Sequence, residues 1–297
     1  MADPDAIQGN GRTPAMELSP QAMGQLCHDA LRLCYLGLIR LGWPTAPMST
    51  GGIETEVRQS VTQAFATYAM THGTGYALTW ELAQETVRRV VKATVLSDRE
   101  AVAASGFVPV ECEIDAMGTL PDGTGGGTVS LRGRWDRVDR HPASGALRVI
   151  DYKYRANDRV EAKDRQLLQA ALRAQRLQPP LYTLMAVAKA GEKVDSPLPE
   201  QVEFVYLLPQ GTPAVERASF AASAWQGSSG PLLSRTLQVL IDGIRAGQHV
   251  IVPDAYCTHC EFSTACRRAH QPSWWRAYRS SQARTLREVR TQKVARD

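Results

Sequence analysis

The spacing of hydrophobic residues predicts helices first and strands afterwards. Apolar residues recur with helical spacing at 18–41, 53–70 and 79–96, and Ser19 and Pro20 form an N-cap and first-turn pair for the first helix. From residue 106 the pattern changes to strand character at 107–115, 128–139 and 146–155, with turns at 121–123 and 142–145. A helical region should therefore precede a sheet.

The second half of the chain continues the mixture. Helical patterns are expected at 162–175, 179–190 and 232–246, and strands at 201–208 and 215–220, before a cysteine-containing loop and a final basic helix. This order predicts an α/β fold, with a mixed sheet flanked by helices. We expect a disordered tail at 1–17, a helical region at 18–100, the core at 101–225, and a C-terminal helix, cysteine cluster and basic tail at 226–297.

Composition narrows the class of protein. The chain is 43% hydrophobic and 22% charged, which is typical of a packed globular protein. Its polar start lacks the apolar stretch of a signal peptide, and no apolar run is long enough to span a membrane, so a cytoplasmic protein is expected. Residues 263–297 hold nine basic and two acidic side chains, a bias that favours a polyanionic partner or, alternatively, a solvated basic helix.

Charged residues interrupt the buried strand pattern at 146–155. Residues two apart in a strand share a face, so Asp151 and Lys153 should lie about 6–7 Å apart on one side of the sheet. Asp136, on the preceding strand, can supply a second carboxylate. Two carboxylates suit Mg²⁺ or Mn²⁺, and a lysine beside them can orient a water molecule or stabilise charge on a phosphate. The alternative is a cross-strand ion pair.

The surrounding residues form an ordered set of motifs. A Gly-x-x-Asp strand is followed by a hydrophobic run ending in Asp-x-Lys, and then by Gln-x-x-x-Tyr on a predicted helix; the residues are Gly133, Asp136, Asp151, Lys153, Gln178 and Tyr182. This order resembles the RecB-like branch of the PD-(D/E)XK nucleases. The resemblance spans residues 18–268 and implies a restriction-endonuclease-like fold.

The resemblance also implies roles for individual residues. Metal ligands would be the two aspartates, Asp136 and Asp151, and the backbone carbonyl of Tyr152. Lys153 would be the catalytic lysine. Gln178 and Tyr182, four residues apart on one helix face, would line the site near the DNA.

One position departs from this family's pattern. Such enzymes often carry a metal-binding histidine in a Gly-x-x-x-His motif of an early helix, and the matching stretch from Gly52 places Glu56 at the histidine position. A glutamate is a suitable oxygen ligand for Mg²⁺ or Mn²⁺. The alternative is a solvated glutamate in the first turn of a helix. None of the six histidines is expected beside the carboxylates.

Three cysteines lie close together near the C-terminus. Cys257, Cys260 and Cys266 have Cys-x2-Cys-x5-Cys spacing, which suits zinc or an iron–sulfur cluster. The layout resembles that of AddB-type helicase–nuclease subunits and CRISPR adaptation nucleases.

That resemblance implies a [4Fe–4S] cluster completed by a lone N-terminal cysteine. Here Cys27 is preferred to Cys34 as the fourth ligand, and the cluster would staple the N- and C-terminal regions together. The alternatives are a zinc site that uses His259 or His270, or buried free thiols.

Together these features predict a metal-dependent DNA nuclease. It would act on single-stranded DNA or DNA ends in repair, recombination or defence, with a helicase as a candidate partner. Arg284, Arg287 and Arg290 would contact DNA, with Trp274 and Trp275 stacking on bases or packing beside the cluster. The competing hypotheses are a non-cutting DNA-binding or scaffold subunit that retains the fold, and a zinc-stabilised regulator.

Overall fold

The computed structural model describes most of the chain. The described residues are 18–44, 46, 48–121, 127–156, 163–188, 197–248, 250, 252–253, 257, 260 and 262–294. The tail expected at 1–17 lies outside them.

Three helices form one layer, as the pattern predicted. They are α1 (Pro20–Arg40), α2 (Thr50–His72) and α3 (Ala77–Ser105). The Ser19 side chain accepts a hydrogen bond from the Ala22 N–H at 3.2 Å, which confirms the predicted N-cap. The third helix is longer than expected and ends where Gly106 adopts a left-handed conformation with φ 75°. Within the described ranges, no helix combines the length and the apolar content needed to cross a bilayer.

A six-stranded mixed sheet covers this layer. The strands are β1 (Val108–Pro121), β2 (Thr128–Arg140), β3 (Leu147–Tyr154), β4 (Met185–Val187), β5 (Gln201–Leu207) and β6 (Val215–Ala221). Their order is β4-β1-β2-β3-β5-β6, and β3 and β5 pair in parallel while the other neighbours are antiparallel. The α/β class and the flanking helices agree with the prediction.

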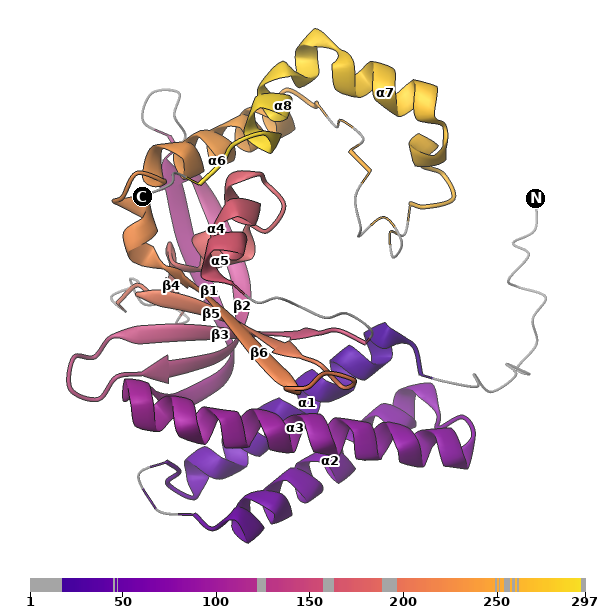
Figure 1. Cartoon of the computed structure of the whole chain (residues 1–297), viewed down its shortest axis with the longest axis vertical. Helices are drawn as coiled ribbons and strands as arrows, with labels where there is room; N and C mark the ends of the chain where they lie inside the picture. The colour runs from indigo at the N-terminus through magenta and orange to yellow at the C-terminus, as the bar shows by residue number, and fades with distance from the viewer. Residues whose placement is uncertain are drawn as a thin grey trace.

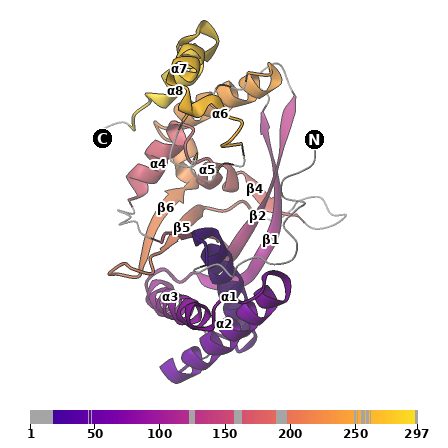
Figure 2. The same ribbon diagram turned by 90° about the vertical axis from the view of Figure 1, so that its right-hand side faces the viewer.

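The opposite face of the sheet carries shorter helices (Figures 1 and 2). They are α4 (Asp164–Leu172), α5 (Gln178–Tyr182) and α6 (Gly230–Arg245). Each face therefore has its own hydrophobic core, so that the side chains of β3 alternate between them: Ile150 packs with α1–α3 and Val149 with the α4–α6 side. The predicted final helix is two helices, α7 (Gln271–Arg279) and α8 (Arg284–Arg290), separated by a 3-10 turn.

The helix expected at 179–190 is wrong beyond its first turn. After α5, residues Met185–Val187 form the edge strand β4, which pairs with β1. Gly118 of β1 permits this approach, because a Cβ there would come within 2.2 Å of the Leu184 carbonyl oxygen. The apolar pattern was too short to distinguish a helix from a buried edge strand.

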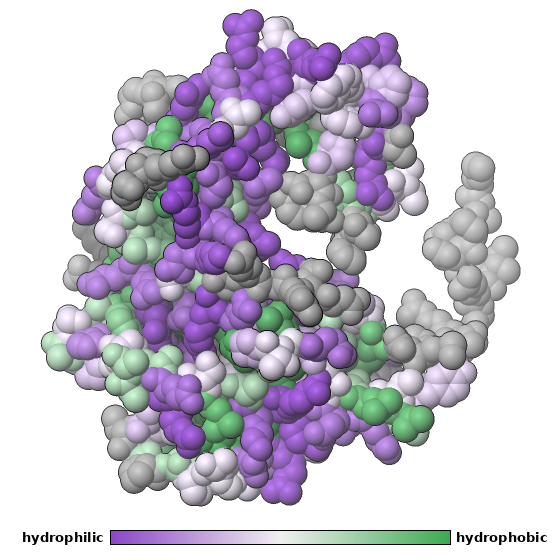
Figure 3. All heavy atoms as spheres, in the orientation of Figure 1, coloured by the Kyte–Doolittle hydropathy of each residue, from purple (hydrophilic) through white to green (hydrophobic). Residues whose placement is uncertain are grey.

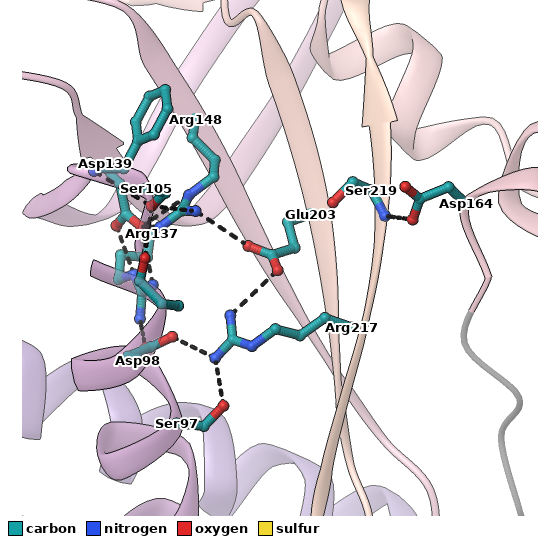
Figure 4. A network of polar contacts seen from close by, with 12 residues as sticks. Ser97, Asp98, Ser105, Arg137, Asp139, Arg148, Asp164, Glu203, Arg217 and Ser219 are labelled. Atoms are coloured by element: carbon teal, nitrogen blue, oxygen red, sulfur yellow. Dashed lines mark hydrogen bonds and ion pairs between the residues drawn. The ribbon is translucent and has the colours of Figure 1, made fainter. Parts of the chain in front are cut away.

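A buried ionic network fixes α3 to the sheet (Figure 4). Arg137 of β2 donates to Asp98 of α3 at 2.6 Å and to Asp139 at 2.7 Å. Arg217 of β6 pairs with Asp98 and, at 3.3 Å, with Glu203 of β5. These charges are enclosed but mutually compensated, so they hold four elements in a single arrangement.

Candidate active site

Asp136 lies where β2 and β3 stop pairing. The antiparallel register joins Arg137 to Ile150 and continues away from the site. One position earlier, the Asp136 carboxylate accepts a hydrogen bond from the Tyr152 N–H at 2.7 Å. The side chain therefore takes the place of a strand partner and is held at the end of the ladder.

Asp151 and Lys153 share the face of β3 that the alternation predicted. The Lys153 Nζ atom lies 2.6 Å from Asp151 Oδ2, and Asp151 is buried. Burial raises the pKa of Asp151 to about 6, with Asp136 adding to the rise and Lys153 opposing it. Another positive charge at this position would keep the carboxylate ionised.

The predicted glutamine and tyrosine reach the same place. Lys153 donates to Gln178 Oε1 at 2.9 Å, and Gln178 Nε2 lies 3.4 Å from the Tyr182 hydroxyl. That hydroxyl donates to the Arg134 carbonyl of β2 at 3.2 Å. The short helix α5 thus sets the position of the lysine through a chain of hydrogen bonds that returns to β2.

A histidine also belongs to this site, contrary to expectation. His28 of α1 places Nδ1 3.4 Å from Asp136 Oδ2 and Nε2 2.9 Å from the Tyr152 carbonyl oxygen. Burial lowers the pKa of His28, but the hydrogen bond and negative charge of Asp136 outweigh it, and the net pKa is raised. The missed signal is plain in the sequence, because Gly24 and His28 have the Gly-x-x-x-His spacing.

Glu56 does not occupy the position assigned to it. Its carboxylate lies against Gly37 of α1, where an added Cβ would collide with it. Gly37 is nine residues beyond His28, which corresponds to about 13 Å along the helix axis. The Gly-x-x-x-His spacing was assigned from Gly52 in α2, whereas the histidine of the site lies on α1. Helix α2 packs against the end of α1 that lies far from His28.

Glu113 is a further acidic residue of the site that the sequence pattern does not indicate. It lies on β1 between the pairs Cys112–Arg137 and Ile114–Trp135, which places it opposite Asp136. Its φ is 57°, an uncommon conformation for a residue with a side chain. Burial and the nearby Asp136 raise the pKa of Glu113, while Arg134, 2.8 Å away, opposes the rise.

The donor set of the site suits a divalent cation. It combines the carboxylates of Asp136 and Asp151, the imidazole of His28 and the carbonyl of Tyr152, which are ligand types that Mn²⁺ and Mg²⁺ accept. In the described part of the chain, no three His, Cys, Asp or Glu side chains already converge as a metal cage. His28 uses both ring nitrogens on Asp136 and the carbonyl, so a cation would replace these two contacts.

The structure does not gather the predicted iron–sulfur ligands. Cys27 and Cys34 are fully buried within the core between α1, α2 and α3, and burial raises the pKa of Cys27 to about 12. Cys257, Cys260 and Cys266 are half-buried, on the C-terminal side of the molecule. His259, the alternative zinc ligand, lies outside the described residues, whereas His270 contacts Ser273 at 2.7 Å. As placed, the described cysteines do not form a four-ligand site.

The three tail arginines differ from one another. Arg284 is exposed. Arg287 donates to the backbone carbonyl of Ser280 at 2.9 Å and to that of Tyr278, so it holds the turn between α7 and α8. Arg290 is half-buried. Arg287 therefore has internal partners that the sequence did not predict, and contact of the three arginines with DNA stays a prediction.

Comparison with known proteins agrees with this geometry. The sequence pattern of the PD-(D/E)XK nuclease superfamily matches residues 7–267, which include every residue of the site from His28 to Tyr182. No curated protein matches the chain at a significant level. The match covers far more than half of the sequence, and the chain belongs to the PD-(D/E)XK nuclease superfamily.

Proposed function

We propose that the protein is a divalent-metal-dependent deoxyribonuclease of the RecB-like branch. The observation that carries this proposal is the meeting of His28, Asp136 and Asp151 at one end of β3, beside Lys153. These are two carboxylates, an imidazole and an ammonium group, gathered from α1, β2 and β3. A purely structural ion pair would need only two of them.

The residues divide into two groups by their chemistry. His28, Asp136, Asp151 and the Tyr152 carbonyl would hold Mg²⁺ or Mn²⁺. When bound, such a cation activates water and neutralises charge on a phosphodiester. Lys153, held by Gln178, is positioned to orient the attacking water or to stabilise the charge that develops on the phosphate.

The imidazole ligand affects the choice of metal. Mg²⁺ prefers oxygen donors, whereas Mn²⁺ accepts nitrogen more readily. We therefore expect Mn²⁺ to support cleavage at lower concentrations than Mg²⁺ does.

Digestion of end-labelled DNA tests the proposed function. Single- and double-stranded oligonucleotides are incubated with Mg²⁺ or Mn²⁺ and the wild type, Lys153→Ala or the control Lys92→Ala, which removes a surface lysine paired with Glu54. Wild type and Lys92→Ala should cleave, whereas Lys153→Ala should lose at least about a hundredfold in rate. DNA binding without cleavage by the wild type would favour the non-cutting scaffold instead.

The substrate and context are further parts of the proposal. We infer that single-stranded DNA or DNA ends are the substrate and that repair, recombination or defence is the setting, with a helicase as a candidate partner. The support is the RecB-like order of motifs from Asp136 to Tyr182. The same digestion, with labels at either end, distinguishes action from an end from internal cutting.

A [4Fe–4S] cluster is proposed separately. Its support is the Cys-x2-Cys-x5-Cys spacing at Cys257, Cys260 and Cys266, with Cys27 as the fourth ligand. Binding would require the C-terminal cysteine segment to approach α1. The cluster would be structural, so no part of the cleavage chemistry depends on it.

A further inference from the structure

A groove continues from the active site along the start of α1. It has a volume of about 440 Å³ and lies between the first turns of α1 and the end of β3. Figure 2 shows these turns of α1 facing the viewer below α5, and Figure 3 shows the surface hollowed between the α7 end and the α1–α3 layer. Its volume is within the range of about 300–1,000 Å³ that is usual for ligand sites.

The chemistry of the groove is complementary to an anion. Its lining contains the glutamines Gln21 and Gln25 from α1 and the basic residue Arg155 that follows β3, and the lining residues include no carboxylate. Both glutamines are exposed, so their amide N–H groups are available to a ligand.

Arg155 differs from the two arginines of the buried ionic network. Arg137 and Arg217 are paired with buried carboxylates, whereas within the described part of the chain the Arg155 side chain has no ion-pair partner. Its backbone N–H donates to Leu207 at 2.9 Å, which anchors the residue beside β5. A guanidinium whose backbone is anchored, and which has no carboxylate partner among the described residues, is suited to bind a phosphate.

The groove and the cleavage site share residues. His28 and Lys153 line the groove, and they also contact Asp136 and Asp151. A polynucleotide whose scissile phosphate lies at the two aspartates would therefore carry its next phosphate into the groove. Contacts of this kind fix the register of a strand without reading its sequence.

We propose that this groove, formed by Gln21, Gln25 and Arg155, binds the backbone phosphate next to the scissile bond of a single nucleic-acid strand. This inference rests on the proposed nuclease function and assigns part of the path of the substrate. It predicts affinity that depends on salt and is independent of sequence.

Binding to a labelled oligonucleotide tests the groove without cleavage. Anisotropy is measured in EDTA with a fluorescein-labelled single strand over a series of KCl concentrations. Arg155→Gln and Gln25→Glu should each weaken binding roughly tenfold. Losing one phosphate contact should also reduce the slope of log affinity against log salt by roughly 0.7.

Two matched substitutions on α2 serve as controls. Arg58→Gln and Gln63→Glu make the same chemical changes at exposed positions outside the groove, and they should retain wild-type affinity and slope. If Arg155→Gln does not fold, Gln25→Glu, at an exposed position, still tests whether the groove binds the strand. A wild type that cleaves DNA while both groove variants bind normally would overturn the groove and leave the nuclease standing. A wild type that neither binds nor cleaves would overturn both.

Discussion

The chemistry of the site depends on how His28 uses its two ring nitrogens. One faces the Asp136 carboxylate and the other faces the Tyr152 carbonyl, so the imidazole already connects two groups that would ligate a metal. A neutral imidazole is needed for ligation, and the proton that Asp136 favours on His28 must leave when a cation arrives. The residue therefore links metal binding to protonation.

Substitutions of His28 and Glu56 should have opposite effects on cleavage and metal binding. His28→Gln should reduce cleavage by at least about a hundredfold and weaken Mn²⁺ binding, because an imidazole ligand is lost. Glu56→Gln should leave both unchanged, since its carboxylate lies against Gly37. Cleavage rates over a Mn²⁺ titration measure both effects. Loss of activity in Glu56→Gln with normal rates in His28→Gln would restore the assignment made from sequence.

Much of the site could be predicted because its residues carry unusual chemistry at fixed spacing. Asp151 and Lys153 interrupt an otherwise buried strand, and alternation alone places them on one face. His28 was missed because helical periodicity does not specify which end of a helix approaches the sheet. Glu113 gave no signal, because its strained backbone conformation cannot be read from a strand pattern.

The ionic network sets the positions of the strands that carry the site. Arg137 follows Asp136 directly and points to the opposite side of β2, where it contacts Asp98 and the hydroxyl of Tyr152 at 2.8 Å. Tyr152 in turn provides the N–H that holds Asp136. Displacing α3 would therefore shift the residues that would bind metal.

Asp98→Asn should reduce the free energy of unfolding by about 3–5 kcal/mol, because Arg137 and Arg217 would lose a buried counter-charge. Burial alone would raise the pKa of Asp98, but the two arginines lower it from 3.8 to about 2. This stabilisation is fully present above about pH 4 and is lost as the pH falls towards 2. Urea unfolding of wild type and variant from pH 8 to 3 measures the difference.

The control for this prediction is Asp242→Asn on the exposed side of α6, which should cost little at any pH. A difference between wild type and Asp98→Asn that stayed constant below pH 4 would show that Asp98 titrates normally. The network itself could not be predicted, since its partners come from α3, β2, β5 and β6. Only the fold brings these distant residues together.

Two arginines of the C-terminal helices should have different roles, one in DNA binding and the other in stability. Arg284→Gln should weaken DNA binding and reduce its salt slope, because the exposed side chain would lose a phosphate contact. Arg287→Gln should instead lower the melting temperature, because its guanidinium holds carbonyls at the end of α7. Anisotropy and thermal unfolding distinguish the two. Equal effects of both variants on the salt slope would return Arg287 to the DNA surface.

The first helix and the C-terminal segment of the described chain pack on opposite faces of the sheet. The C-terminal part already docks on the core, since Gln169 of α4 donates to the Gln292 carbonyl at 2.7 Å and accepts from the Val294 N–H at 3.0 Å. Cys27 lies on the other side of the sheet, in the α1–α3 core. A cluster that used Cys27 would therefore add a connection that these packing contacts do not provide.

Cys27 and Cys34 form a matched pair for testing that connection. Both are fully buried on α1, seven residues apart, so a serine at either position carries a similar burial cost, and Cys27→Ser should lose the stabilisation by the cluster in addition. Protein purified anaerobically should be brown, with about four irons per chain. Cys27→Ser should lose the colour and most of the iron, whereas Cys34→Ser should keep both.

Iron retained in Cys27→Ser but lost in Cys34→Ser would move the ligand by two helical turns. Stoichiometric zinc in protein made with ample iron would instead replace the cluster with a zinc site. The carboxylates beside His28 would remain in place under either result, because their contacts with the described residues include no cysteine.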